Sequence, residues 1–164
     1  MKKNDHLEFV GLEKLFAKQL EQLIEFERWA SAHDWKSFHA AHYDWWMFPI
    51  DHSSRLGFSY TVYEAEVIAL KTQEHFIENY LRGVELLLLS WGWELKNSRF
   101  IENPEEEQTW HQRPIRIYKC LQSLILFGFE KEAQSVKLYA KSLIARGEDF
   151  SFRGKELKQL FLEE

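Results

Sequence analysis

The fold is decided by the stretch PIRIYKCLQSLILFGF, residues 114–129. Apolar side chains cover most of the circumference of a helix built from it. The polar side chains fall in one narrow stripe: Arg116, Lys119 and either Ser123 or Gln122. Pro114 suits the first turn of a helix, where its missing N–H is not required, and Gly128 suits the left-handed residue that ends one. Because a helix this apolar is normally surrounded by others, we predict a central helix that ends at Gly128.

A second segment of the same kind is FIENYLRGVELLLLSWG, residues 76–92. Its polar residues also share one stripe: Glu78, Arg82 and Glu85. We predict a helix over about residues 74–91 that ends at Gly92. Since a buried charge is expensive unless it is paired, we expect the two glutamates of this stripe to face Arg116 and Lys119 of the first helix.

Helical periodicity extends over most of the remaining chain. From Leu12, apolar residues recur at spacings of three and four, which predicts an N-terminal helix over about residues 11–32. Further helices are expected after Asp34 as a cap, after Thr61 with Glu64 as a capping box, after Thr72 as a cap, over about 130–146 and over about 155–163. Residues 43–60 and 93–113 are expected to be loops. The sequence thus predicts an all-α fold, a single domain over residues 1–164 with about six or seven helices and an aromatic-rich irregular loop.

Composition restricts the function classes. The 164 residues carry a formal net charge of −5, which argues against a nucleic-acid partner. Residues 1–109 carry −8 and residues 110–164 carry +3, so the charge is uneven. The longest apolar segment, residues 84–93, is too short to span a bilayer. Cys120 is the only cysteine and the first residues lack a signal-peptide pattern, so we expect a cytoplasmic protein without a transmembrane segment.

The patterns that usually carry catalysis are weak. The glycines are isolated, which argues against a phosphate-binding loop. Cys120 lies among apolar helical neighbours and is expected to be an inert thiol. His39 and His42 share a helix face, but their spacing matches no metal-ligand signature. Glu64 and Glu66 point to different faces of a helix. We therefore expect no cofactor and no metal, and an enzyme is the less favoured class.

The aromatic residues are the most unusual feature, at 16% of the chain. Six of them fall in loops or at helix ends: Trp45, Trp46, Phe48, Trp91, Trp93 and Trp110. Two interpretations stay open. Such rings can pack loops onto the bundle, or they can anchor a recognition surface, as Trp, Tyr and Arg commonly do. Adjacent Trp45 and Trp46 cannot both point into one core unless the backbone there is unusual.

Four segments together resemble a known family, the opioid growth factor receptor conserved region. They are HYDWWMFPI, TVYEAEV, VELLLLSWGWEL and PIRIYKCLQSLILFGFE, in order and with similar spacing within about residues 39–145. The last is the closest match, at Arg116, Ile117, Leu121, Ser123, Leu124 and Gly128. The paired tryptophans at 45–46 and the WGW at 91–93 depart from the animal pattern and look like a microbial branch. The resemblance implies an all-helical domain that, in animals, belongs to a receptor for a small opioid peptide, and it brings no ligand residues with it.

The preferred functional hypothesis is a non-enzymatic module that binds a peptide or protein segment. It would use the aromatic loop, residues 43–60, and the basic helix stripe with Arg116 and Lys119. Arg113 or Arg116 would pair with a carboxylate of the ligand. The candidate binding residues are Asp44, Trp45, Trp46, Asp51, Tyr60, Trp93, Arg113, Arg116 and Lys119. One alternative is an enzyme or small-molecule binder with a polar pocket between the central helices, formed by Asp44, Asp51, Tyr60 and Arg116. Another is an assembly role, in which exposed aromatic residues bury in a homodimer.

Overall fold

The computed structural model describes residues 1–163. The helices are α1 (Leu12–Ser31), α2 (Trp35–Ala40), α3 (Asp44–Met47), α4 (Glu64–Lys71), α5 (Phe76–Ser90), α6 (Pro114–Phe127), α7 (Glu130–Ala145) and α8 (Gln159–Leu162). Two small antiparallel hairpins join them, β1 (Trp93–Glu94) with β2 (Arg99–Phe100), and β3 (Ser151–Phe152) with β4 (Lys155–Glu156). The predicted all-α class is confirmed.

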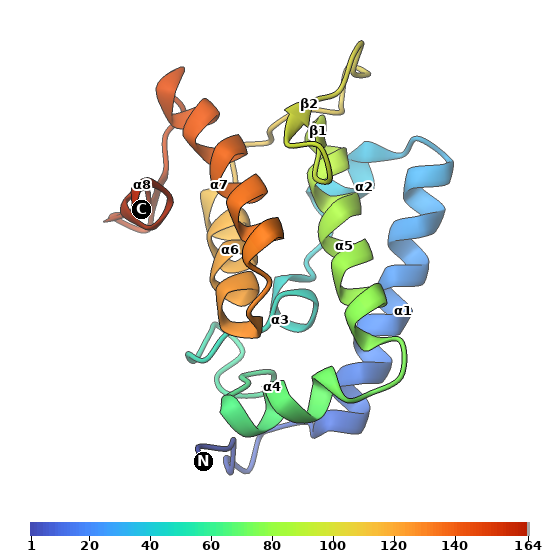
Figure 1. The fold of residues 1–164 in the computed structure, drawn as a ribbon, viewed down its shortest axis with the longest axis vertical. Coiled ribbons are helices and arrows are strands. Elements are labelled where there is room, and N and C mark those ends of the chain that lie inside the picture. The colour runs from blue at the N-terminus through green and yellow to red at the C-terminus, as the bar shows by residue number, and fades with distance from the viewer. Residues whose placement is uncertain (164) are drawn as a thin grey trace.

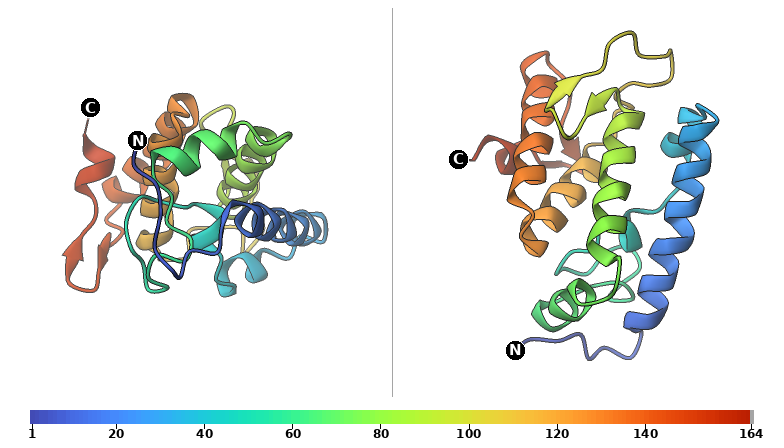
Figure 2. Two further views of the ribbon diagram at one scale, coloured as in Figure 1. Left: turned by 90° about the horizontal axis from the view of Figure 1, so that it is seen from below. Right: turned by 45° about the vertical axis from the view of Figure 1, so that its right-hand side comes forward.

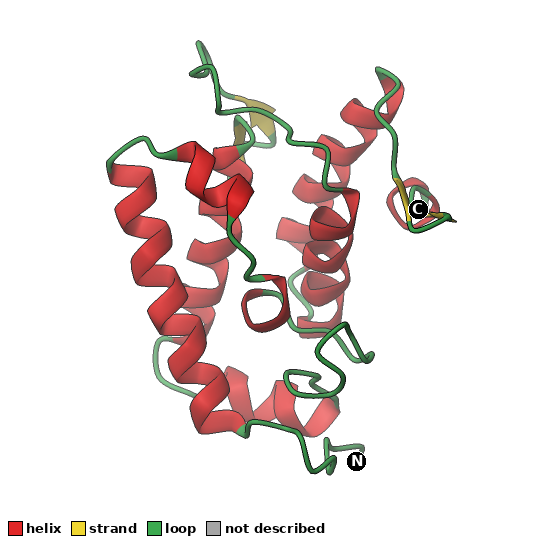
Figure 3. Ribbon diagram, turned by 180° about the vertical axis from the view of Figure 1, so that it is seen from behind, coloured by secondary structure: helices red, strands yellow, loops and turns green. Residues whose placement is uncertain are grey.

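The long helices form two packed pairs, α1 with α5 and α6 with α7. Helix α4 lies across one end of the molecule and the β1–β2 hairpin lies at the other (Figure 1). The short helix α3 sits between the two pairs, as the view from behind shows (Figure 3). The buried residues form one hydrophobic cluster that includes side chains of both pairs. At its centre the Tyr80 hydroxyl of α5 donates a hydrogen bond of 2.7 Å to Ser123 of α6.

Several helix boundaries follow the predicted signals. Helix α1 begins at Leu12, and Asp34 caps α2 by accepting a hydrogen bond from the Ser37 backbone N–H. Pro114 occupies the first turn of α6. Gly128 ends that helix with a φ of 81°, in the left-handed region that favours glycine.

Other predicted boundaries are wrong. Thr61 does not cap α4, since its hydroxyl donates to the His52 carbonyl, and the Tyr63 N–H is instead satisfied by the Glu66 carboxylate. Thr72 does not cap α5, which begins after His75 in a left-handed conformation. The predicted loop 93–113 contains the β1–β2 hairpin.

The predicted C-terminal helix over 155–163 is also wrong, because it is replaced by β4 and the four-residue α8. The β3–β4 turn has Arg153 and Gly154 at φ values of 51° and 79°. Two consecutive positive φ values are typical of a tight hairpin turn. Phe152 and Lys155 are paired across it.

The predicted pairing of the two polar stripes is wrong. Arg82 of α5 pairs with Glu85 on its own helix and with Glu27 of α1. Arg116 of α6 pairs with Asp44, which comes from α3. Arg116 and Lys119 therefore face the aromatic loop, whereas Ser123 of the same helix faces Tyr80 of α5.

Candidate functional site

Arg116 is the largest side chain that the fold buries almost completely, at 1% exposure. Its Nε donates to Asp44 Oδ1 at 2.8 Å and its Nη2 to the Ala41 carbonyl at 2.7 Å. Its Nη1 donates to the Phe38 carbonyl at 2.9 Å and to the Tyr43 hydroxyl at 3.1 Å. The guanidinium also lies 4.2 Å from the centre of the Tyr43 ring. Since its three nitrogens are engaged and out of reach, Arg116 is a structural residue, which corrects its proposed role in ligand binding.

The Arg116 network fixes the start of the aromatic loop on α6. It holds residues 38–44, and α3 begins at Asp44, so the position of Trp45 follows from the same contacts. Lys119 lies three residues along α6 from Arg116, and its ammonium lies 5.3 Å from the centre of the Trp45 ring. The buried ion pair thus positions the tryptophan that lies at the molecular surface.

This arrangement borders a groove with a volume of about 540 Å³. Its walls are residues 42–55, one face of α6, and the β3–β4 hairpin. Helix α3, at the start of the aromatic loop, and strand β3 of the hairpin both contact α6, and in the view from below part of the aromatic loop lies beside the C-terminal segment (Figure 2, left). The helix contributes residues spaced by three and four: Ile115, Tyr118, Lys119 and Gln122. Such spacing places the four side chains on one helix face.

The walls of this groove are strongly cationic. They carry five formal positive charges: Arg55, Arg113, Lys119, Arg153 and Lys155. None of the five forms an ion pair within residues 1–163. Asp44 is the one acidic residue on these walls in the described part of the chain, and its carboxylate is held by Arg116. The groove therefore presents uncompensated positive charge in a protein whose net charge is −5.

Lys119 is the most constrained of these cations. Burial lowers the pKa of its ammonium, the Asp44 carboxylate opposes that shift, and Arg116 adds to it. The indole Nε1 of the adjacent Trp45 is buried and has no hydrogen-bond partner within residues 1–163. A half-buried cation beside an aromatic face is a favourable place for an anion. Because its ammonium has already lost part of its hydration, binding of a ligand charge there displaces less water.

The other predicted aromatic residues have structural roles. Trp46 donates from Nε1 to the Gln22 side chain at 3.1 Å and packs edge-on against Tyr60. Trp93 is 4% exposed and donates from Nε1 to Ser135 of α7. Trp46, Tyr60 and Trp93 therefore do not line the cationic groove.

The residues of the predicted polar pocket do not converge on one cavity. Asp44 is paired with Arg116, whereas Asp51 forms an exposed 2.6 Å contact with His52. Asp44 and Tyr60 border a recess of only about 10 Å³, close to the size of one water molecule. The structure thus brings together Asp44, Trp45, Arg113 and Lys119 from the candidate set and separates the others.

Sequence reasoning missed most of the groove wall, including three of its five cations. Arg55, Arg153, Lys155 and Tyr118 line it, but no motif marked them. The available signal was Gly154, because glycine readily adopts the positive φ that a tight turn between two short strands requires.

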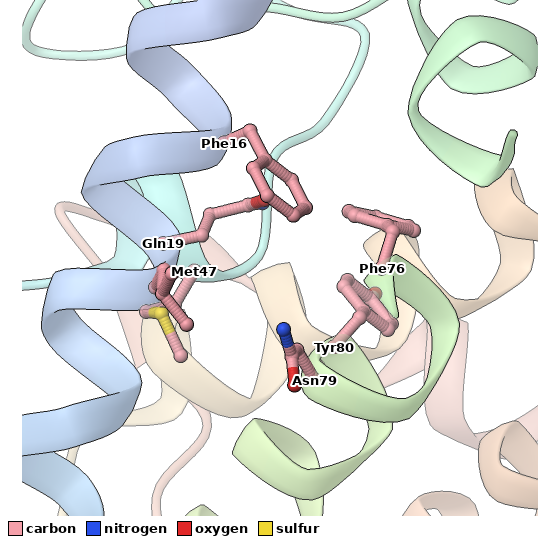
Figure 4. Close-up of a pocket in the computed structure, with 7 residues that line it drawn as sticks. Phe16, Gln19, Met47, Phe76, Asn79 and Tyr80 are labelled. Atoms are coloured by element: carbon pink, nitrogen blue, oxygen red, sulfur yellow. The ribbon is translucent and has the colours of Figure 1, made fainter. Parts of the chain in front are cut away.

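Other depressions are less suited to a ligand. The recess between α1 and α5 in Figure 4, lined by Phe16, Gln19, Met47, Phe76, Asn79 and Tyr80, has a volume of about 10 Å³. A groove of about 320 Å³ beside Arg82 and Lys96 has mixed charges, several of them already paired. Within residues 1–163 no group of three or more His, Cys, Asp or Glu could hold a metal ion. No helix in the same range could cross a membrane.

His39 gives the structure a pH dependence. Its Nε2 donates to the Glu107 carbonyl at 2.7 Å, its Nδ1 is buried without a partner among the described residues, and its ring stacks on His111 at 4.5 Å. Burial lowers the pKa of His39, as do His111 and Arg116, against the opposing hydrogen bond to Glu107. The neutral imidazole is therefore the form that the fold stabilises.

We expect the free energy of unfolding to fall as the pH drops below about 6.5. In that range His39 binds a proton in the unfolded chain, whereas burial keeps it neutral in the folded protein. The measurement is urea unfolding between about pH 5 and pH 8 for the native chain and His39→Gln, whose amide can still donate to Glu107. The variant should have the weaker pH dependence. Identical slopes for the two proteins would show that His39 does not contribute.

No family model, no curated protein and no solved structure matches the chain. The fold and the site therefore define its class by themselves. It is an all-α protein with a cationic, aromatic-lined groove between its aromatic loop, α6 and a C-terminal hairpin.

Proposed function

We propose that the protein is a non-enzymatic binding module that receives an acidic protein segment in the cationic groove. The observation that carries this proposal is the set of five cations around one groove that form no ion pair within residues 1–163, where the one carboxylate on the groove walls is already engaged. Charge of one sign on the walls of a cleft attracts ligands of the opposite sign and raises their local concentration. Arg113 and Lys119 are the residues that would meet a ligand carboxylate, in place of the buried Arg116.

Aromatic rings give the groove a second type of contact. Trp45, Tyr118 and Phe152 are on its walls, one from each of its three elements. Large rings of this kind supply most of the apolar contact area in recognition sites. The preferred ligand is thus a segment that combines acidic residues with an apolar side chain.

The similarity to the opioid growth factor receptor conserved region stays a prediction. It is compatible with the all-α fold, and it includes Arg116, whose network holds the aromatic loop. We propose a distant relationship that concerns the fold and not the animal receptor's peptide. A cytoplasmic location is likewise proposed, on the basis of the single thiol of Cys120, which is buried and whose pKa is raised by burial.

The test uses fluorescein-labelled degenerate heptapeptides with a central Phe, in one pool with flanking Glu and in a matched pool with flanking Gln. Fluorescence anisotropy should show binding of the Glu pool that weakens with added salt, since exposed charges are screened. Lys119→Met and Arg113→Gln should each lower the affinity about tenfold, as expected for the loss of a charge-assisted contact. The control is Lys141→Met, which removes an exposed lysine outside the groove.

Equal binding of the Glu and Gln pools, or equal losses in Lys119→Met and Lys141→Met, would contradict the proposal. Sedimentation of the same samples tests the homodimer alternative. If the chain is a dimer whose formation is abolished by Lys119→Met, the groove is an interface between two copies and not a peptide site.

A further inference from the structure

The cations of the groove come from all three of its walls. Arg55 belongs to the aromatic loop, Arg113 and Lys119 to the start and the exposed face of α6, and Arg153 and Lys155 to the C-terminal hairpin. A ligand group in the groove is thus approached by donors from several directions.

A carboxylate and a phosphoryl group differ in both shape and charge. A carboxylate has two coplanar oxygens and one negative charge, which a single arginine can satisfy through two parallel hydrogen bonds. A phosphoserine has three terminal oxygens in a tetrahedral arrangement and a charge of about −1.5 to −2 at neutral pH. The groove has five cations on three walls, and the one carboxylate on these walls within residues 1–163, Asp44, is already paired, so it matches the larger negative charge of the second group better.

Lys119 and Arg113 are placed to supply the innermost contacts. Lys119 lies against the Trp45 ring, half-buried and without an ion-pair partner in the described chain. Arg113 precedes the first turn of α6 and is also only half-exposed. Because both have already lost part of their hydration, a doubly charged ligand gains more from them than from the exposed Arg55, Arg153 and Lys155.

We propose that the groove recognises a phosphorylated protein segment, with the phosphoryl group between Arg113 and Lys119 and neighbouring acidic residues beside the hairpin cations. This inference rests on the proposed function and specifies its ligand.

A short protein segment fits this surface better than a nucleic acid. Without the five groove cations the formal net charge of the chain would be −10, so a polyanion that extends beyond the groove meets an acidic surface. The exposed loop with Glu105 and Glu106 is part of that surface. A segment with one phosphoryl group places its charge inside the groove alone.

The test compares fluorescein-labelled heptapeptide pools that differ at one central position, which is phosphoserine, Glu or Gln, with identical degenerate flanks. We expect the phosphoserine pool to bind at least about tenfold more tightly than the Glu pool, which corresponds to about 1.4 kcal/mol. Lys119→Met should remove most of that preference and Lys119→Arg should retain it, while Lys141→Met should leave it unchanged. Inorganic phosphate and a degenerate heptameric RNA are tested as competitors.

The outcomes separate the two proposals. Equal affinities for the phosphoserine and Glu pools, both above that for Gln, overturn the phosphoryl inference and leave an acidic-segment module. Failure of all acidic pools to bind overturns both. Tighter binding of the RNA than of the phosphoserine pool identifies a nucleic-acid site instead. Full competition by inorganic phosphate at the affinity of the peptide would show that the free anion is the ligand and would overturn recognition of a protein segment.

Discussion

Arg116→Met is expected to lower the free energy of unfolding by about 3–5 kcal/mol, the range measured when one partner of a buried ion pair is removed. The substitution keeps much of the side-chain volume but leaves the Asp44 carboxylate buried without its cation. It also leaves the Tyr43 hydroxyl and the carbonyls of Phe38 and Ala41 without the donor that they share. Urea unfolding followed by tryptophan fluorescence provides the measurement.

Two comparisons isolate the cause of that loss. Arg113→Met removes an arginine that forms no ion pair in the described chain, so it should change stability by no more than about 0.5 kcal/mol. Arg116→Lys keeps the charge, but a single ammonium cannot take the place of the three guanidinium nitrogens that donate to Asp44, Phe38 and Ala41. This substitution should therefore also be destabilising. A stability change in Arg116→Met as small as in Arg113→Met would refute the structural role of the network.

The long helices could be predicted because their patterns are local. Twenty residues of α1 repeat an apolar face, and Pro114 and Gly128 mark the two ends of α6 within one continuous segment. The polar stripe of α6 was also visible, together with the requirement that Arg116 must find a partner. The identity of that partner was not predictable, because pairing with Asp44 depends on how two segments 72 residues apart meet.

The site was predictable to the extent that it lies on such local features. Trp45, Arg113 and Lys119 stand out in the sequence because they belong to an aromatic cluster or a helix stripe. The cations of the hairpin do not, since two-residue strands are too short to show an alternating pattern. Prediction of a helix over residues 155–163 further concealed Lys155, because a helix assigns it to a different face.

The first ten residues, which no pattern marked, are held to the aromatic loop by a buried polar cluster. The Asn4 N–H donates to both carboxylate oxygens of Glu66 at 3.0 Å, and the Asn4 side chain donates to the carbonyls of Phe58 and Thr61. Glu66 also accepts from the Tyr63 N–H at 2.9 Å. A single carboxylate, 5% exposed, thus fastens the N-terminal segment and the start of α4 together.

Glu66→Ala is therefore expected to lower the free energy of unfolding by about 2–4 kcal/mol, since it leaves the N–H groups of Asn4 and Tyr63 unsatisfied at about 1–3 kcal/mol each. The substitution should also release the N-terminal segment, which makes a second readout possible. Hydrogen exchange of the Asn4 amide should become faster by a larger factor than that of amides in α6, because the segment opens locally before the bundle unfolds.

Glu64→Ala is the matched control, since Glu64 lies two residues earlier in the same helix and is exposed. It should change stability by no more than about 0.5 kcal/mol and leave Asn4 protected. Equal effects of the two substitutions would mean that charge near the start of α4, and not the buried carboxylate, stabilises this end of the molecule. A stable Glu66→Ala protein with a protected Asn4 amide would show that the hydrogen bonds of the Asn4 side chain to Phe58 and Thr61 are sufficient to hold the segment in place.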